Sequence, residues 1–328
     1  MGRVLTAAIL AILLVVIIGP RFIALLRRRG IGQSIRKEGP ARHQSKAGTP
    51  TMGGLLILVS AVVPYLLLGS YSLGGLLVLG LLLGSAFIGF LDDSSKLLRK
   101  RSLGISGKAK MALQLMVLLV VGWVAYRFAG LDTSVSVPLV GTKVELGWFY
   151  ILLAYLVVSG TANTVNLTDG LDGLAAGTVA IALLAYTGIA WLQGDKDLAI
   201  LSASLMGGCV GFLWYNSFPA AIFMGDTGAL ALGAALGGLA IMTGTELYLP
   251  LIGAIFVIEG MSLIIQVIAV RVFHRRVFLM SPIHHHFELK NWSETKIIVR
   301  FWIVTAIFAA SGFALHYLES ARGVLPWW

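Results

Sequence analysis

Carboxylates stand beside long apolar runs at three places in this sequence. Asp92 and Asp93 follow the run GSAFIGFL, Asp169 and Asp172 belong to NLTDGLDG, and Asp226 directly precedes another apolar run. Each group alone fits an ordinary interfacial carboxylate or, for Asp226, a helix cap. Adjacent carboxylates at a predicted helix end repel each other and oppose the helix dipole, so Asp92 and Asp93 favour a nearby divalent cation.

The chemistry that these groups offer is the binding of a hard metal ion. Carboxylate oxygens without cysteine partners suit Mg²⁺, which keeps several waters and bridges to phosphate groups. The only cysteine, Cys209, lies in an apolar run. Asn166, Asp169 and Asp172 are spaced by three residues, so a helical turn would place them near one face, and Asn163 extends the series. We therefore expect a single polar site.

Two further segments carry groups that can contact anions. The run Pro282–Glu288 contains His284, His285 and His286, of which at most two can point into one site in a helix or strand. Contact with phosphate or a nucleobase fits this run better than zinc, which prefers spaced histidines. In His43–Gly54, HQSKAGTPTMGG, backbone N–H groups of a glycine-rich loop are candidates for phosphate contact, although no Walker A ending is present.

Long apolar helices must position these groups. Of the 328 residues, 58% are hydrophobic and 12% are charged, and the mean hydropathy is +0.89. Soluble domains carry roughly 25% charged residues. Apolar runs of about 20 residues cross the hydrocarbon core of a bilayer. The ten expected transmembrane helices cover approximately 4–26, 52–69, 73–91, 109–129, 148–165, 173–192, 198–215, 227–243, 249–270 and 297–318.

Basic residues are concentrated in alternate segments between these helices. Lys and Arg are frequent in 27–51, 92–108 and 271–296, whereas 130–147 and 193–197 contain few. The positive-inside rule then places the basic segments in the cytoplasm and both termini outside. The net charge of +10 is spread over these segments. It therefore indicates contact with anionic membrane lipids or substrates, and no nucleic acid partner is expected.

The remaining features point to structural roles within one all-α transmembrane domain spanning 1–328. The alternating stretch 130–147 predicts a short external hairpin. Glu259 and Gln266 share one face of a predicted helix; a deep acid is a functional candidate, but a hydrogen bond to a neighbouring helix is the simpler explanation. The 39 glycines are expected to permit close helix packing, among them Gly74, Gly80, Gly84 and Gly89.

Five segments together resemble one known family. HQSKAGTPTMGG, FLDDSSKLLRK, NTVNLTDGLDGLA, WYNSFPAAIFMGDTG and SPIHHHFELKNW are similar to motifs of the phospho-N-acetylmuramoyl-pentapeptide transferases, the MraY family. The acidic motifs are shared with the wider superfamily of polyprenyl-phosphate N-acetylhexosamine-1-phosphate transferases. The triple histidine and the GTPTMGG loop are specific to the muramoyl branch. The resemblance extends from the first predicted cytoplasmic loop to the last.

The resemblance implies a Mg²⁺-dependent reaction in the bacterial cytoplasmic (inner) membrane. Undecaprenyl phosphate attacks the β-phosphate of UDP-N-acetylmuramoyl-pentapeptide, which releases UMP and forms lipid I, the first lipid intermediate of peptidoglycan synthesis. The active site would lie on the cytoplasmic face, where a soluble donor and a lipid phosphate can meet. A homodimer is also consistent with the family.

The resemblance also implies roles for individual residues. Asp226 is the expected Mg²⁺ ligand, Asp92 and Asp93 lie near the metal and the lipid phosphate, and His284 joins them as a catalytic residue. A phosphate monoester is largely ionised at pH 7, so base catalysis by Asp92 matters less than electrostatic clamping of the diphosphate. The expected substrate contacts are Lys46, Thr51, Asn166, Asp169, Gly170, Asp172, Asn216, Phe223, His285 and His286.

Two other functions stay open as alternatives. A sibling enzyme that transfers N-acetylglucosamine-1-phosphate to the same lipid shares the acidic motifs, although the intact triple histidine favours the muramoyl substrate. A secondary transporter would place its polar residues at the bilayer midplane. Only Glu259 and Gln266 are expected to be deep, which disfavours transport. Direct attack and a covalent aspartyl-phosphate both remain open mechanisms.

Overall fold

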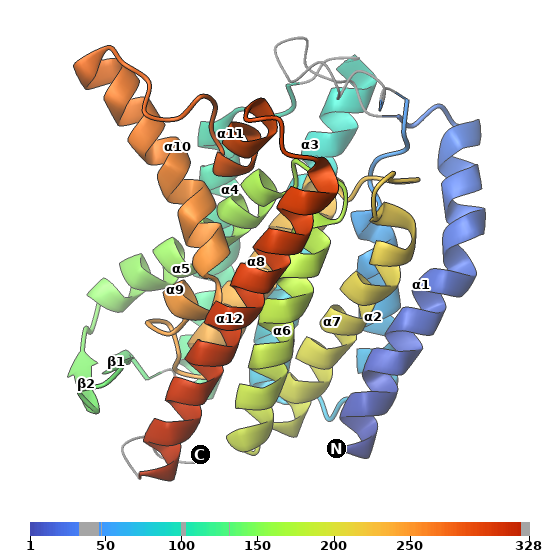
Figure 1. Ribbon diagram of the computed structural model, residues 1–328. Coiled ribbons are helices and arrows are strands. Elements are labelled where there is room, and N and C mark those ends of the chain that lie inside the picture. Colours follow the sequence, from blue (N-terminus) through green and yellow to red (C-terminus); the bar gives the residue numbers. More distant parts are fainter. Residues whose placement is uncertain (33–45, 47, 100–102, 131, 323–328) are drawn as a thin grey trace.

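The computed structural model describes residues 1–32, 46, 48–99, 103–130 and 132–322. Within these ranges, nine helices are long and apolar enough to cross a membrane, and α2 (Gly54–Leu68) is a shorter apolar helix. The prediction of an all-α polytopic membrane protein is therefore confirmed (Figure 1). The long helices are α1 (Gly2–Arg28), α3 (Leu73–Arg99), α4 (Gly107–Val124, continued by the π-helical turn η2, Ala125–Ala129), α5 (Phe149–Thr168), α6 (Leu174–Leu192), α7 (Lys196–Asn216), α8 (Gly225–Met242), α10 (Ala254–Phe273) and α12 (Glu294–Ala321).

The end of α3 differs from the prediction. The helix continues beyond residue 91 to Arg99, so Asp92 and Asp93 lie about two turns before its last residue. The placement of these acids at a helix end was therefore wrong. The loss of hydropathy after residue 91 marks the edge of the apolar span, and a helix with polar residues can continue past that edge.

The predicted helix 249–270 is also divided. Its first turn is the short helix α9 (Leu249–Ile252), and α10 begins after Gly253. The triple histidine then lies on another short helix, α11 (Ile283–Leu289), which the sequence pattern did not predict. In Figure 1, α11 lies beside α10 and the beginning of α12.

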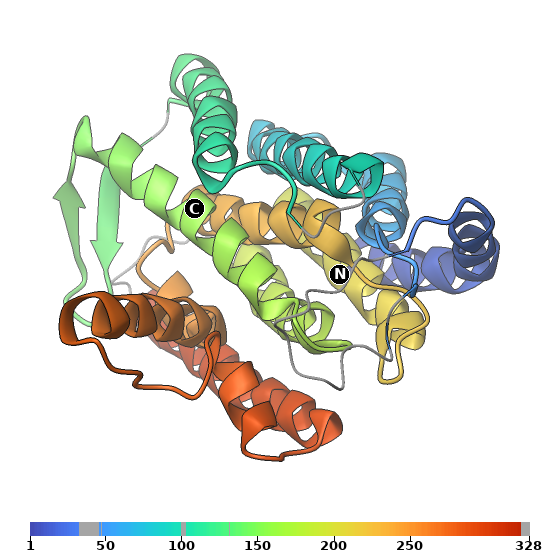
Figure 2. The ribbon, with the colours of Figure 1, turned by 90° about the horizontal axis from the view of Figure 1, so that it is seen from above.

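Helix α8 is the most enclosed of the transmembrane helices described. Its apolar window is 78% buried, compared with 28% for α1 and 17% for α4, and Figure 2 shows other helices on all sides of it. A Cβ atom at Gly54 of α2 would lie 2.2 Å from the α8 backbone, and one at Gly89 of α3 would lie 2.3 Å from the backbone oxygen of Asp226. Glycine at these positions thus sets how closely α2 and α3 approach α8.

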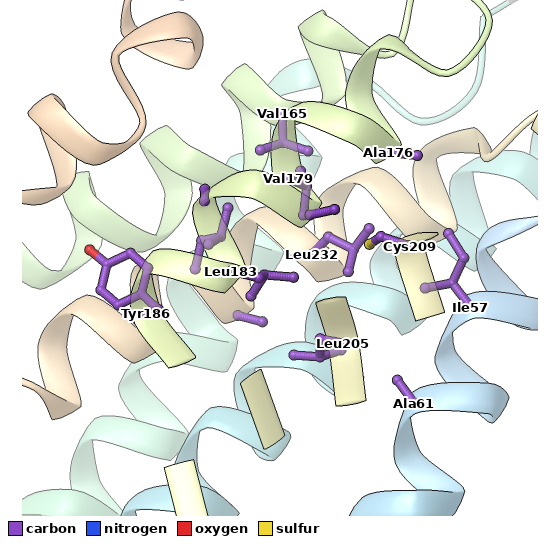
Figure 3. Packing of buried hydrophobic residues seen from close by; sticks show 14 of the residues in the cluster. Ile57, Ala61, Val165, Ala176, Val179, Leu183, Tyr186, Leu205, Cys209 and Leu232 are labelled. Atoms are coloured by element: carbon purple, nitrogen blue, oxygen red, sulfur yellow. The ribbon is translucent and has the colours of Figure 1, made fainter. Parts of the chain in front are cut away.

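An apolar core fills the space between α2, α6, α7 and α8. Ile57, Leu183, Leu205 and Leu232 are completely buried in it, together with Cys209 (Figure 3). The cysteine is a core residue with the packing role of a small hydrophobe. This packing fixes the axial positions of the helices, and therefore the positions of the polar residues at their ends.

The two ends of the bundle differ in character. The predicted hairpin is present, with β1 (Ser134–Val137) antiparallel to β2 (Thr142–Glu145). It lies toward the end of the bundle where α1 begins and α12 ends, while α11 and the end of α3 lie at the opposite end (Figure 1). The common side of the start of α1 and the end of α12 agrees with an even number of membrane crossings.

The orientation of this bundle can be tested with reporter fusions. Fusions after residues 100 and 285 should report a cytoplasmic location, and fusions after 140 and 195 an external one, because Lys and Arg are concentrated in the first pair of segments. Paired alkaline phosphatase and green fluorescent protein fusions at each position provide internal controls. An external location at 285 would contradict the proposed orientation.

Candidate active site

Three carboxylates from α3 and α8 meet at one end of the bundle. Oxygens of Asp92, Asp93 and Asp226 lie within 4.8 Å of one another. Asp93 Oδ1 accepts a hydrogen bond from Asp226 N at 3.2 Å, and its Oδ2 accepts from Thr227 N at 2.9 Å and Thr227 Oγ1 at 2.7 Å. Asp93 of α3 therefore caps the first turn of α8, the role for which sequence alone had suggested Asp226.

Two lysines balance most of this negative charge. Lys96 Nζ lies 2.7 Å from Asp92 Oδ2 and 2.8 Å from Asp226 Oδ1. Lys110 Nζ of α4 lies 3.1 Å from Asp92 Oδ1 and also pairs with Asp226 Oδ2. With three carboxylates and two ammonium groups, the cluster keeps one formal negative charge. Both lysines thus connect α3 and α4 to the start of α8.

The donor set of this cluster fits a hard divalent cation. All three acids offer carboxylate oxygens, and Asp92 is fully buried while Asp93 is only 3% exposed. Buried carboxylates gathered so closely need cationic partners, because Coulomb repulsion is poorly screened away from water. The cluster can therefore hold a metal ion, with Asp226 nearest to the solvent.

A second ionic group surrounds Lys46. Lys46 Nζ lies 2.8 Å from Asp172 Oδ1 and 2.6 Å from Glu294 Oε1 at the start of α12. Glu294 Oε1 also accepts from Asp172 N at 2.9 Å, and Asp172 Oδ2 accepts from Ala220 N at 2.9 Å. The ammonium group lies 5.6 Å from the centre of the Phe218 ring. These contacts join the first loop, the α5–α6 turn and α12.

Asp169 lies between the two groups. Burial and the nearby Asp226 carboxylate raise the pKa of Asp169 to about 7, against the opposing effect of a hydrogen bond from Gly225 N–H. Since α5 ends at Thr168, Asp169 and Asp172 occupy the following turn. The expectation that Asn166, Asp169 and Asp172 share one helical face was therefore wrong.

Asn163 and Asn166 separate in role within α5. Asn163 Nδ2 donates to Gln114 Oε1 of α4 at 2.9 Å, so this side chain holds two helices together. Asn166 lies one turn closer to the α5–α6 turn and is half-buried. Asn163 therefore has a structural role, although it belongs to the same series of three-residue spacings as Asn166, which lies nearer to the candidate site.

Asn216 shapes the loop that leads into α8. Its Oδ1 accepts from Gly173 N at 3.0 Å, and its Nδ2 donates to Ile222 O at 2.8 Å. The side chain is 2% exposed. Asn216 therefore fixes the α7–α8 loop against the start of α6.

The first loop is bonded to the segment before α8. Phe223 N donates to Pro50 O at 2.8 Å, Gly53 N to Phe223 O at 2.8 Å, and Gly54 N to Met224 O at 2.8 Å. The expectation that these glycine N–H groups are available to phosphate was therefore wrong for Gly53 and Gly54. These bonds involve only the backbone of Phe223, whose residue is half-buried.

Thr51 of the first loop lies near the carboxylate cluster. It is 7% exposed. A Cβ atom at Gly225 would lie 3.1 Å from Thr51 Oγ1 and 2.8 Å from Asp93 Oδ2, so this glycine, with φ of 77°, allows both groups to approach the start of α8.

The three histidines of α11 divide into a pair and a single ring, which agrees with the expectation that at most two can point into one site. His284 is completely buried, with Nδ1 3.0 Å from Glu259 Oε1 of α10. The His285 ring lies against it, with centroids 4.1 Å apart. His286 Nδ1 accepts from Leu279 N at 3.1 Å, which directs this ring toward the 277–281 loop. The structure thus brings His284 and His285 together and separates His286 from them.

Several groups of this site were not among the residues predicted from the sequence. Lys96 carried a usable signal, since it stands three and four residues after two acids on one helix. Lys110 carried none, because its partners Asp92 and Asp226 are 18 and 116 positions away in the chain. Glu294 gave only the general signal of an acid near the cytoplasmic side. Its contact with Lys46 spans 248 positions.

A family model described as Glycosyl transferase family 4 matches residues 75–244, which include all three clustered carboxylates. The fold and the site thus define a transferase of this class, built into a membrane protein. A narrower match, described as Phospho-N-acetylmuramoyl-pentapeptide-transferase signature 1, covers residues 46–58, which include Lys46 and Thr51.

Full-length relatives agree with this signature. The phospho-N-acetylmuramoyl-pentapeptide-transferase of Geobacillus sp. is 48% identical over 317 residues, which are 95% of this chain and 97% of the relative. Those of Halalkalibacterium halodurans and Moorella thermoacetica are 48% and 46% identical, and cover 93% and 96% of this chain and 95% and 99% of the relatives. The chain belongs to the phospho-N-acetylmuramoyl-pentapeptide-transferase family.

The lysine contacts predict a difference between two neighbours on α4. Lys110→Gln should lower turnover by at least about tenfold, because it removes a charge that pairs with two carboxylates of the cluster. Lys108→Gln is the matched control, since this exposed lysine is two residues away on the same helix. Its turnover should stay within about twofold of wild type. Equal rates of UMP release by both variants would contradict the assignment of Lys110.

Proposed function

We propose that this protein transfers phospho-N-acetylmuramoyl-pentapeptide from its UDP-linked donor to undecaprenyl phosphate, forming lipid I and releasing UMP. The whole chain acts as one transferase domain in the bacterial cytoplasmic membrane, with its site on the cytoplasmic face. The carboxylate–lysine cluster at one end of membrane-length helices is the observation that carries this proposal. It supplies charge stabilisation at the level where a lipid phosphate and a soluble donor can meet.

The carboxylate cluster is the proposed phosphate-transfer centre. Mg²⁺ bound to Asp226, with Asp92 and Asp93 beside it, would neutralise charge on the diphosphate as the transition state forms. Lys96 and Lys110 reach the same carboxylates, so they are placed to hold phosphate oxygens when the donor binds. Asp93 keeps the start of α8 in place through its three hydrogen bonds.

The transfer exchanges one phosphoanhydride bond for another. An oxygen of undecaprenyl phosphate attacks the β-phosphorus of the donor, and the bond to the oxygen of UMP breaks. Since the attacking phosphate is already ionised at neutral pH, no strong base is needed. The protein chiefly orients the two phosphates and offsets their mutual repulsion.

The Lys46 group is the proposed site for the nucleoside part of the donor. Lys46 is held by Asp172 and Glu294, and the half-buried Phe223 offers an aromatic face for uracil. Thr51 and Asp169 lie near the carboxylate cluster, and Asn166 and Gly170 are proposed as further contacts to the donor. Asn216 supports the loop behind them.

The histidines take different parts in this proposal. The His285 side chain is 14% exposed and pairs with Glu288 at 2.6 Å, whereas the completely buried His284 contacts the α5–α6 turn at Gly170. His286 orders the 277–281 loop through Leu279. We therefore propose substrate contact for His285 and not for the other two. Assembly as a homodimer stays a prediction from family resemblance.

Removal of one carboxylate charge tests the metal-binding role. Asp226→Asn should reduce turnover below about a tenth of wild type, because it removes a formal charge from the metal site while keeping its shape. Thermal stability in detergent should change little, since an amide can still accept from a lysine. Activity above that level would remove Asp226 from the mechanism.

The choice of donor separates the proposal from its nearest alternative. Purified protein with undecaprenyl phosphate and Mg²⁺ should release UMP from UDP-N-acetylmuramoyl-pentapeptide at least about tenfold faster than from UDP-N-acetylglucosamine. Omission of the lipid phosphate or addition of EDTA provides the controls. Preference for the N-acetylglucosamine donor would identify the sibling transferase instead.

A further inference from the structure

A buried carboxylate on α10 contacts the first histidine of α11, outside the carboxylate and Lys46 groups. Glu259 and His284 are both completely buried. Glu259 Oε1 lies 3.0 Å from His284 Nδ1, and Glu259 Oε2 accepts from Ile283 N at 3.0 Å. Both oxygens of the carboxylate are therefore engaged by α11.

These contacts define where the imidazole carries its proton. A carboxylate can only accept, so His284 Nδ1 must be the protonated nitrogen. His284 Nε2 is buried and, among the described residues, has no hydrogen-bond partner. A proton on that nitrogen would be an unpaired buried donor, which is unfavourable. The arrangement thus favours the neutral Nδ1–H tautomer.

The unprotonated nitrogen faces the turn that carries two site acids. A Cβ atom at Gly170 would lie 2.3 Å from His284 Nε2. One Cα hydrogen of Gly170 occupies that direction, and a nitrogen lone pair accommodates it as a weak C–H···N contact. A proton on Nε2 would instead collide with this hydrogen and push the turn away. Asp169 and Asp172 flank this contact and belong to the proposed site.

We propose that Glu259 is a positioning residue for phosphate transfer, which holds His284 as its Nδ1–H tautomer so that the Asp169–Asp172 turn can rest on the ring. Glu259 itself touches neither the carboxylate cluster nor Lys46 in the contacts described above. It acts through His284 and Gly170. The kinetic part of this inference rests on the proposed function, whereas the tautomer assignment does not.

Glu259→Gln is expected to move the His284 proton from Nδ1 to Nε2, for a geometric reason. Ile283 N can only donate, so the amide oxygen must stay on its side. The amide nitrogen then faces His284 Nδ1 and donates to it, which moves the imidazole proton to Nε2, against Gly170. We expect kcat to fall by at least about tenfold, with the KM of the donor changed by less than about threefold.

Glu246→Gln is the matched control. Glu246 is another buried glutamate, 2% exposed, that accepts from Tyr150 OH at 2.5 Å. Glu246 lies beyond the last residue of α8, Met242, whereas Asp226 lies in the first turn of this helix. It is therefore far from the carboxylate cluster. Its kcat should stay within about twofold of wild type. An equal loss in both variants would show a general effect of neutralising a buried acid and would overturn the inference.

The tautomer is read by ¹⁵N nuclear magnetic resonance of histidine-labelled protein in nanodiscs, with His284 assigned by its substitution. Wild type should show a protonated Nδ1 and an unprotonated Nε2, and Glu259→Gln the reverse. A wild-type Nε2–H or imidazolium would overturn the inference, even if the variant fails to fold. Normal kcat in a folded Glu259→Gln would also overturn it. Absence of UMP release from wild type would instead reject the proposed function, because the tautomer measurement needs no substrate.

Discussion

The close approach of three carboxylates at one end of the bundle is the constraint on which the rest of the site depends. Like charges at this separation, away from bulk water, destabilise each other unless cations or hydrogen-bond donors lie nearby. Two lysines and the first turn of α8 provide those partners for Asp92, Asp93 and Asp226. The same partners fix three helices relative to one another. The same contacts therefore stabilise both the site and the packing of these helices.

Small residues allow this arrangement to form. Gly89 lets α3 pass the first turn of α8, and Gly104 lets the loop after α3 fold over Asp92, since a Cβ there would lie 2.2 Å from Asp92 Oδ1. The loop is then bound by Ile105 N, which donates to the same oxygen at 2.8 Å. Packing in the transmembrane part and chemistry at its end thus require glycine for the same reason. Backbones must approach where no side chain fits.

Much of the fold could be predicted because a continuous apolar run long enough to cross the bilayer indicates a transmembrane helix by itself. The hairpin was predictable for a similar local reason. The end of α3 was not, since hydropathy reports the edge of the apolar span while hydrogen bonding decides where the helix stops. The division between α9 and α10, and the short helix α11, depend on tertiary contacts that leave no periodic pattern.

The acids of the site were found because carboxylates beside apolar runs need an explanation. The groups that surround them were harder to find. Lys110 and Glu294 look like ordinary charged residues in sequence, and only the fold brings them to Asp226 and Lys46. For Glu259 the sequence favoured a structural hydrogen bond to a neighbouring helix. The hydrogen bond between Glu259 and His284 of α11 confirms that prediction. The proposed influence of Glu259 on the active-site turn could be inferred only from the structure, which places Gly170 beside His284.

The central claim is that the carboxylate cluster holds a divalent cation against the diphosphate of the donor. Mn²⁺ substitutes for Mg²⁺ at oxygen sites and is visible by electron paramagnetic resonance. The account predicts that purified protein binds Mn²⁺ and that addition of the UDP-linked donor produces ³¹P hyperfine coupling to the ion. Asp226→Asn should abolish this coupling. Bound Mn²⁺ without ³¹P coupling in the wild-type protein, or coupling that persists in Asp226→Asn, would contradict the account.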